Sequence, residues 1–317
     1  MDDPIEWLYG SCLMSASLSV MSFPKLTKKS WAIFCAVLLV ALVTLTREWM
    51  HMPDGRLHFY ALDIGQGDSL LIVTPSGRTV LMDAGPDLTA LQKLSEVLPL
   101  LRRRIDLIVL SHPHQDHLGA FPDLLERYEV GAAMLSGIQY PNADYQRMLR
   151  LLKEHHVRVI IPDPSKDIDL GDGVVLDVLY PKPGLFGKKG SEDDVNNTSV
   201  ALRVLYEDQS ILLAGDMEIP EEDGILQTGA DVSATVLKVA HHGSRTSSST
   251  GWLIEAGAHP FGPAEPHEAP LMLKTAVISA GRNNKFKHPN TDVVERLKQF
   301  GLETHLTAKE GTIHLSW

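Results

Sequence analysis

The sequence predicts an α/β sandwich with helices on its outer faces, preceded by one transmembrane helix. Two observations predict the sandwich. From Leu57 onward short apolar strands alternate with turn signals, and helical patterns interrupt the runs of strands. A third observation predicts the membrane helix, because residues 30–46 form a run of 17 residues without a charge. With 317 residues and 44% hydrophobic content, the chain is long enough for one large domain or two small ones.

The N-terminal segment 30–46 reads SWAIFCAVLLVALVTLT, and we expect a transmembrane helix or signal anchor there. As a helix it would be roughly 26 Å long at about 1.5 Å per residue, against a bilayer core of about 30 Å. A buried core helix and a cleaved signal peptide are the alternatives. Apolar residues surround the whole helix, which favours the membrane. The long leader and the lack of a clear small-x-small cleavage site disfavour a signal peptide.

The charges that flank this segment predict its orientation. Lys25, Lys28 and Lys29 precede it, whereas Arg47 and Arg56 are the basic residues close behind it. The positive-inside rule then makes residues 1–29 a cytoplasmic leader and places residues 50–317 on the extracytoplasmic side.

The remainder of the chain, residues 57–317, is expected to form one domain. Strands are expected at 57–64, 69–74, 79–85, 105–111, 156–161, 174–180, 199–206, 210–214, 235–240 and 276–279. Helices are expected at about 87–101, 118–129, 142–154 and 291–300. Two stretches rich in Pro, Gly or charge, 181–194 and 258–270, are too long for ordinary connections, so each is expected to be a lid or a disordered insertion.

The stretch LSHPHQDHLGA, residues 110–120, directly follows an apolar strand. Pro113 favours an extended conformation at His112. His112 and His114 then share one face of the extended segment, so their imidazoles converge on one point. The chain then turns into a helix, which lets Asp116 and His117 reach a second point a few ångströms away. Imidazole and carboxylate suit Zn²⁺, Mn²⁺ or Fe²⁺, and two ions about 3.5–4 Å apart can clamp the attacking and leaving oxygens of a phosphoryl or acyl transfer.

Composition limits the other ligands and the partners. Both cysteines, Cys12 and Cys35, lie in the first 35 residues, so a metal bound by residues 36–317 must be held by His, Asp or Glu. The net charge of −11 argues against a dedicated, sequence-reading DNA-binding protein, whose footprint is a broad basic face. A small basic patch inside a cleft would not show in that total.

Seven ordered stretches resemble the metallo-β-lactamase superfamily and, more narrowly, the C-terminal hydrolase domain of ComEC-type competence proteins. They are LDIGQGDSLLI, LMDAG, SHPHQDHLGA, NNTSVALRV, LLAGDME, LKVAHHGSRTSSS and ISAGRNNKFKHP, and they span about residues 57–317. The resemblance implies an αββα sandwich with a dinuclear site at the sheet edge between its halves, holding two divalent ions, Zn²⁺ or Mn²⁺.

The resemblance also implies a role for single residues. His112 and His114 would bind the first metal, Asp116 and His117 the second, with Asp116 also taking part in catalysis. Asp216 would bridge the ions, and His288 would be the last ligand of the second. His242 matches a position that faces the substrate in related phosphodiesterases, as a general acid or phosphate ligand, whereas His241 is expected to pack or hydrogen-bond locally.

The sequence departs from the superfamily at the third histidine of the first site. NNTS stands where a GHTPG-like pattern is typical, so Asn197 would be a weak oxygen ligand or none. Losing an imidazole weakens Zn²⁺ binding more than binding of a harder ion, so we expect Mn²⁺ to be at least competitive.

Aspartates on strands that meet near the site are candidates for supporting roles. Asp83 is expected to fix the ligand loop by hydrogen bonds. Asp63 is assigned the same role, although a purely structural turn is an equal alternative for Asp63 and Asp68. Gly65 and Gly67 would allow a close backbone approach or a positive φ.

Basic residues inside or beside the motifs favour a phosphodiester over a neutral lactam or thioester. They are Lys238, Arg245, Arg282, Lys285 and Lys287. Ser244, the amide of Gly243 and Arg245 are expected to hold the non-bridging oxygens, with a merely solvated basic rim as the alternative. Phe286, between two lysines, is a candidate stacking platform.

The motifs and the resemblance together predict a membrane-anchored, metal-dependent phosphodiesterase, a ComEC-like nuclease that cleaves DNA outside the cytoplasm by a metal-activated water. In competence proteins, such a domain is thought to degrade the strand that is not imported, and a separate channel or uptake protein would be its partner. The alternatives are a small-molecule phosphodiesterase of the cell envelope and a non-catalytic DNA-guiding domain.

Overall fold

The computed structural model of the chain describes residues 27–181, 184–192, 194–259 and 272–317. The chain divides into two units, the first ending at Thr46 and the second spanning Arg47–Trp317. Helix α1, Lys28–Met50, has a mean hydropathy of 2.0 over its apolar window and no buried residue. By length and composition this helix can cross a membrane. The leader predicted at 1–29 falls almost entirely outside the described residues.

The strands of the second unit form two seven-stranded sheets within the described part of the chain. The first has the order β14 (Ile313–Ser316), β1 (His58–Ala61), β2 (Leu70–Val73), β3 (Thr79–Met82), β4 (Arg104–Leu110), β5 (Glu129–Leu135), β6 (Arg158–Ile160). The second has the order β13 (Glu303–Leu306), β12 (Thr275–Ile278), β11 (Val236–Lys238), β10 (Gln209–Leu213), β9 (Ala201–Tyr206), β8 (Val174–Tyr180), β7 (Ile168–Gly171).

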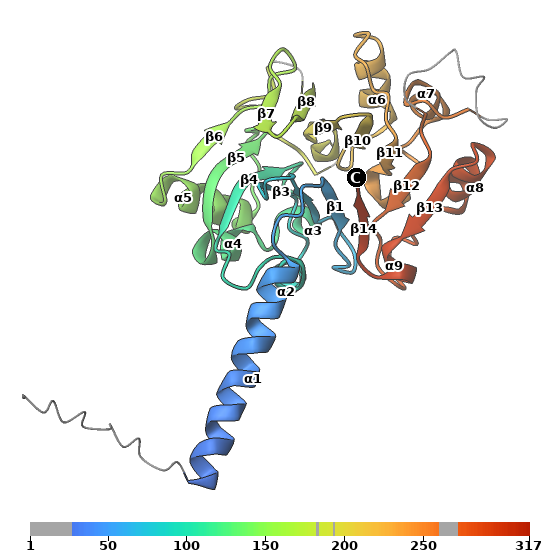
Figure 1. The fold of residues 1–317 in the computed structure, drawn as a ribbon. Coiled ribbons are helices and arrows are strands. Elements are labelled where there is room, and N and C mark those ends of the chain that lie inside the picture. Colours follow the sequence, from blue (N-terminus) through green and yellow to red (C-terminus); the bar gives the residue numbers. More distant parts are fainter. Residues whose placement is uncertain (1–26, 182–183, 193, 260–271) are drawn as a thin grey trace, which may run out of the picture. The chain divides into compact units, whose positions relative to one another are not determined.

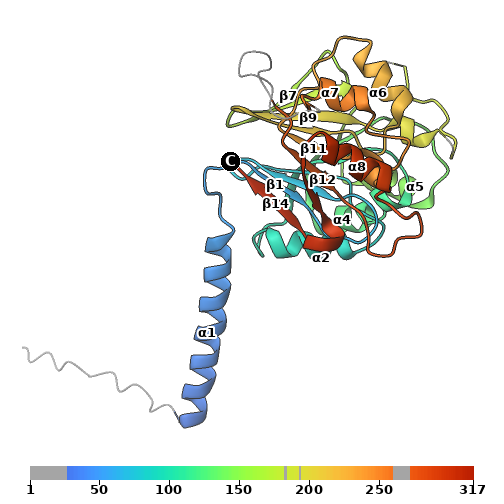
Figure 2. The same cartoon turned by 90° about the vertical axis from the view of Figure 1, so that its right-hand side faces the viewer.

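Helices cover the outer face of each sheet (Figures 1 and 2). The first sheet carries α2 (Thr89–Val97), α4 (Phe121–Arg127) and α5 (Ala143–Glu154), and the second carries α6 (Ile219–Leu226), α7 (Thr250–Glu255) and α8 (Thr291–Gln299). The short α3 (Gln115–Leu118) follows β4, and α9 (Thr307–Glu310) follows β13. This is the predicted αββα sandwich, so the predicted fold class is confirmed.

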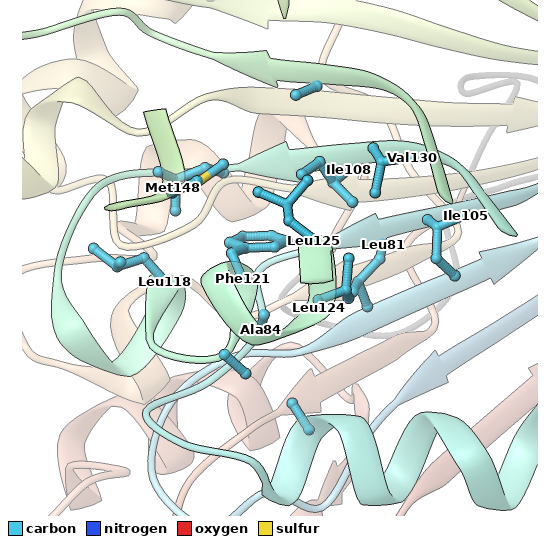
Figure 3. Packing of buried hydrophobic residues seen from close by; sticks show 14 of the residues in the cluster. Leu81, Ala84, Ile105, Ile108, Leu118, Phe121, Leu124, Leu125, Val130 and Met148 are labelled. Carbon is cyan, nitrogen blue, oxygen red and sulfur yellow. The ribbon is translucent and has the colours of Figure 1, made fainter. Parts of the chain in front are cut away.

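Three buried clusters explain why these strands and helices pack in four layers. In β2, Leu70 and Ile72 enter the cluster between the sheets, while Leu71 on the opposite face joins the cluster under the helices. A strand buried on both faces reads as a continuous apolar run, as LLIV does. Phe121 of α4 packs among sheet residues such as Ile108 (Figure 3). Truncating this fully buried ring to alanine would cost about 3–5 kcal/mol.

Several predicted elements were wrong or missing. In place of the predicted helix 118–129, α3 ends at Leu118, residues 119–120 form a turn, and α4 spans only Phe121–Arg127. Strand β5 was missed because Gly and Ala in EVGAAML carry little strand preference, and its pairing with β4 overrides this. Other elements that sequence analysis missed are β7, β13, β14, α6, α7 and α9.

The two long loops are only partly described. Most of 258–270 lies outside the described residues, as do 182–183 and 193. Residues 187–190, however, are held by backbone hydrogen bonds to Gly137 and Gln139, for example Gly190 N to Gln139 O at 2.9 Å. This part of the 181–194 loop is therefore anchored and is not a disordered insertion.

Candidate metal centre

The site residues lie at one end of the sandwich, after the carboxyl ends of neighbouring parallel strands. β3 and β4 are parallel in the first sheet, and β10, β11 and β12 are parallel in the second. Asp83 follows β3 and the histidine motif follows β4, while Asp216 follows β10 and His242 follows β11. Segments that are distant in sequence thus meet where parallel α/β sheets commonly place their sites.

The first predicted pair, His112 and His114, converges on one point. His112 Nε2 lies 3.0 Å from His114 Nδ1. Two imidazole nitrogens at that separation can both lie about 2.0–2.1 Å from a single ion. The other nitrogen of His112 faces the hydroxyls of Ser111 and Ser199, at 3.0 and 3.3 Å. Burial holds the pKa of His112 well below its ordinary value, which favours the neutral, metal-binding form of the ring.

His117 is oriented by Asp83. Its Nδ1 lies 2.8 Å from Asp83 Oδ2, and both side chains are fully buried. The same carboxylate accepts hydrogen bonds from the Ser111 backbone N–H at 2.8 Å and hydroxyl at 2.6 Å. Asp83 therefore joins His117 to the ligand loop and leaves His117 Nε2 free to face Asp216 Oδ2 at 3.3 Å. This carboxylate–histidine arrangement is typical of metal ligands.

Asp216 lies at the centre of the cluster. Its Oδ2 is 3.3 Å from His117 Nε2 and 3.4 Å from His242 Nε2, while Asp116 Oδ2 is 3.5 Å from the same nitrogen of His242. Burial opposes ionisation of Asp216, but His242 and His117 outweigh it and hold the pKa of this carboxyl well below its ordinary value. Among the described residues, four groups of possible ligand atoms each lie within 4.8 Å of one another, and two of them consist only of predicted site residues: His112 with His117 and Asp216, and Asp116 with His117 and His242.

Buried polar groups on the side of the ring opposite the carboxylates orient His242. Its Nδ1 donates to the Ser279 carbonyl at 3.0 Å, which directs Nε2 toward the carboxylates. Asp68 Oδ1 lies 3.5 Å from the same Nδ1, and Asp68 Oδ2 accepts from Lys238 Nζ at 2.8 Å. The backbone at Gly67, with φ +119, passes close to the backbone of Asp116. Only glycine fits there, since a Cβ would lie 2.2 Å from the Asp116 carbonyl oxygen. The close backbone approach predicted for this glycine is therefore observed.

Part of this cluster borders a cleft of about 300 Å³. Its lining is Gln66, His114, Gln115, Asp116, Glu192, Asn196, Asp216, His241, His242, Lys285, Phe286 and His288. Among the residues that the structure describes, five buried atoms of the candidate ligands find no hydrogen-bond partner: His114 Nε2, His117 Nε2, His242 Nε2, His288 Nδ1 and Asp216 Oδ1. Buried polar atoms are almost always satisfied, so a cluster of imidazole and carboxylate atoms without partners fits a divalent cation.

His288 and His241 lie beside this cluster. The ring centroids of His241 and His288 are 5.6 Å apart, and those of His242 and His288 are 6.4 Å apart. His241 is only partly buried, with Nε2 3.8 Å from Asp216 Oδ2 and Nδ1 3.6 Å from Glu218 Oε1. His241 does contact its neighbours, as the sequence predicted, but it also lines the cleft.

Other predicted site residues are directed elsewhere. Asn197 Oδ1 accepts from the Glu218 backbone N–H at 3.1 Å, so this oxygen stabilises a turn. Ser244 Oγ contacts Thr246 Oγ1 at 3.0 Å, and the exposed Arg245 is not among the residues that line the cleft. Gly243 packs against Pro289. Asp63 hydrogen-bonds through its backbone N–H to Thr312, outside the cleft.

The predicted cationic rim needs one correction. Lys238 is fully buried and paired with Asp68, so it supports the cluster and cannot contact a substrate in the cleft. Arg282 Nε donates to the Ala308 carbonyl at 2.6 Å. Of the five basic residues, Lys285 is the one found in the lining of the cleft as far as the structure describes it, and its side chain is exposed.

Sequence reasoning missed Gln66, Glu192 and Asn196 as cleft residues. The signal for Asn196 was present in NNTS, but the choice between adjacent asparagines depends on a 3₁₀ turn at Val195–Thr198. That turn directs Asn197 to Glu218 and leaves Asn196 at the cleft, where its buried Oδ1 has no partner within the described part of the chain. Glu192 arrives from an irregular loop, where no periodic pattern predicts side-chain direction.

Comparison with known proteins gives a family match over most of the second unit. The family described as the metallo-beta-lactamase superfamily matches residues 62–282. Among solved structures, the metallo-beta-lactamase fold protein YhfI from Bacillus subtilis aligns with a TM-score of 0.51 and 16% identity, covering 83% of this chain and 100% of that chain. This likeness supports the fold.

Curated relatives are longer than this chain. ComE operon protein 3 of Bacillus subtilis is 28% identical over 269 residues, 80% of this chain and 32% of that protein. Competence protein ComA of Neisseria gonorrhoeae is 28% identical over 290 residues, 90% and 35% respectively. Recombination protein 2 of Haemophilus influenzae is 26% identical over 263 residues, 81% and 28%. The chain spans about a third of the length of these relatives.

Proposed function

Because the chain belongs to the metallo-β-lactamase superfamily, we propose that its cleft is a divalent-metal centre that hydrolyses phosphodiester bonds in DNA. The observation that carries the proposal is a cluster of four histidines and two aspartates, of which His114, Asp116, Asp216 and His242 line one cleft. The six residues are His112, His114, His117, His242, Asp116 and Asp216. Nitrogen and oxygen donors of this kind suit Zn²⁺ and Mn²⁺.

The donor set suggests how two ions would be shared. His112 and His114 would hold one ion, and Asp116, His117 and His242 the other, with Asp216 between them and His288 at the cleft margin. When bound, the ions would activate a water molecule and neutralise charge on the phosphate. The first ion would lack a third imidazole, because NNTS contains no histidine, and the Asn197 oxygen that could replace it is engaged with Glu218. This supports the expectation that Mn²⁺ competes with Zn²⁺ there.

If His242 is a metal ligand, it cannot also be the general acid that the resemblance implied, and we assign that role to His241. His242 Nε2 lies between two carboxylates and is buried, as a ligand would be. His241 borders the open cleft, and Glu218 and the hydroxyl of Thr246, at 3.6 and 3.3 Å, orient its Nδ1. His241 Nε2 is therefore in a position to donate a proton to the leaving oxygen. Lys285 would neutralise a neighbouring phosphate.

Relatives and the apolar helix suggest the setting. Two of the similar proteins bear names that refer to the ComE operon and to competence. We infer a DNA substrate from this likeness and from the cationic Lys285, and a membrane anchor from α1. The lysines before α1 favour an extracytoplasmic hydrolase unit, which would work beside a separate channel or uptake protein.

A substrate panel tests the proposal. The full chain in detergent micelles would be incubated with single-stranded DNA, double-stranded DNA and a small chromogenic phosphodiester, each with Mn²⁺, Zn²⁺ or chelator. We expect metal-dependent cleavage of DNA. Cleavage of the small ester alone would instead support an envelope phosphodiesterase, and DNA binding without turnover under any metal would support a DNA-guiding domain.

A further inference from the structure

Phe286 is an exposed aromatic side chain at the mouth of the cleft. It is 52% exposed, yet it lines the same cleft as Asp116, Asp216 and His288. An isolated exposed apolar residue needs no explanation. An exposed ring beside a cluster of metal-type ligands is different, because it can contact a ligand that occupies the same cleft.

The loop around Phe286 is fixed by hydrogen bonds. The Asn284 side chain donates to the carbonyls of Gly281 and His288, at 2.9 and 2.6 Å, and accepts from the His288 backbone N–H at 3.0 Å. The Lys287 backbone N–H donates to Asn284 O at 3.1 Å. Because these bonds close the loop on both sides of Phe286, its ring is presented in a defined place without being buried.

The ring has two chemical neighbours. The His288 ring lies nearly parallel to it, with centroids 5.8 Å apart and an interplanar angle of 26°. Lys285 Nζ lies 4.8 Å from the ring centroid. An exposed cation–π contact is weak, so a planar ligand can displace the ammonium group, which then remains close enough to bind a flanking phosphate.

We propose that Phe286 stacks with a nucleobase next to the scissile phosphate and so makes the centre prefer nucleic acids over phosphodiesters that lack bases. This inference rests on the proposed phosphodiesterase function. Stacking on an aromatic side chain is tolerant of base identity, because every base has a π face. The centre would therefore cleave DNA without strong sequence preference.

The test compares two substrates that differ only in their bases. Oligothymidylate and an abasic sugar–phosphate oligomer of equal length would be given to the full chain with Mn²⁺. We expect the wild type to prefer oligothymidylate. Phe286→Ala should lower kcat/KM for oligothymidylate by roughly 5- to 150-fold, the range expected for one lost base stack, and leave the abasic oligomer unaffected.

Three further variants test whether the aromatic ring itself is responsible. Phe286→Trp keeps a π face and should retain the preference, whereas Phe286→Leu should lose it. Phe186→Ala is the matched control, since Phe186 is also exposed, at 67%, but does not line the cleft. Its rates should be unchanged for both substrates.

The other outcomes are equally decisive. Equal losses on both oligomers in Phe286→Ala would show that the ring acts through His288, which overturns the stacking proposal. So would a wild type that does not discriminate between the oligomers. If neither oligomer is cleaved, the proposed function fails, and the stacking proposal is tested by fluorescence anisotropy. Wild-type chain that binds oligothymidylate no more tightly than the abasic oligomer would then overturn it.

Discussion

His117 Nδ1 lies 2.8 Å from Asp83 Oδ2, with both side chains shielded completely from solvent. Asp83 follows β3 and His117 belongs to α3, so the pair joins two segments that are 34 residues apart. The same carboxylate holds Ser111 through two hydrogen bonds. Asp83 thereby fixes both the start of the histidine motif and the ring that faces Asp216.

Asp83→Asn should weaken metal binding without removing any candidate ligand. An amide has one acceptor oxygen where the carboxylate has two, so His117 or Ser111 loses its partner and the His117 tautomer is no longer enforced. We expect affinity for Mn²⁺ or Zn²⁺ to fall about 10- to 100-fold. Isothermal titration calorimetry measures this directly, with far-UV circular dichroism to verify folding. Unchanged affinity in a folded variant would contradict the orienting role.

His241 and His242, although adjacent, should respond differently to substitution. His242→Ala should lose metal from the second site, because its Nε2 faces Asp116 and Asp216. His241→Ala should retain metal and lose about 10²–10⁴-fold in kcat, as expected for a lost general acid. Metal content by mass spectrometry and DNA cleavage rates separate the two. Retention of both ions by His242→Ala would restore the sequence-based assignment of His242 as a substrate-facing residue.

Lys238→Met should destabilise the fold because it leaves Asp68 buried without its cation. Removing one partner of a buried ion pair typically costs about 3–5 kcal/mol. The double variant Lys238→Met with Asp68→Leu removes both charges and should recover part of that loss. Urea unfolding measures both free energies. If the single and double variants are equally unstable, the ion pair is not the source of the effect.

Two lysines in place of Leu38 and Leu42 should release the chain from membranes. Each lysine near the centre of a spanning helix costs about 2.5–3.5 kcal/mol, and both positions lie within the apolar window of α1. Carbonate-washed membranes should contain the wild-type chain and little of the variant. Wild-type chain in the soluble fraction would contradict the anchor.

Much of the fold could be predicted from sequence because its strands carry strong local signals. The apolar runs before each glycine-rich or aspartate-rich turn predicted β1 to β4 to within a few residues of their observed bounds. The resemblance to ComEC-type competence proteins, carried by those turns, is confirmed by relatives at 26–28% identity. Strand β5 was not predicted, because its pairing with β4, and not its own composition, makes it a strand.

The site was predictable only where ligands lie close together in sequence. His112, His114, Asp116 and His117 share one strand end, so their convergence follows from local geometry. The burial of Lys238, the turn that diverts Asn197 to Glu218, and the exposure of His241 to the cleft depend on how the two sheets meet. Charge and motif position alone placed Lys238 on the rim, whereas packing places it beneath the ligands.

The most direct test of a metal-dependent phosphodiesterase is the rate of DNA cleavage by the full chain before and after chelation. Removal of bound ions should abolish cleavage, and Mn²⁺ or Zn²⁺ should restore it in the wild type. Asp216→Asn, which alters the central carboxylate, should stay inactive at every metal concentration while remaining folded. Cleavage that persists in the chelated chain, or in folded Asp216→Asn, would contradict the account.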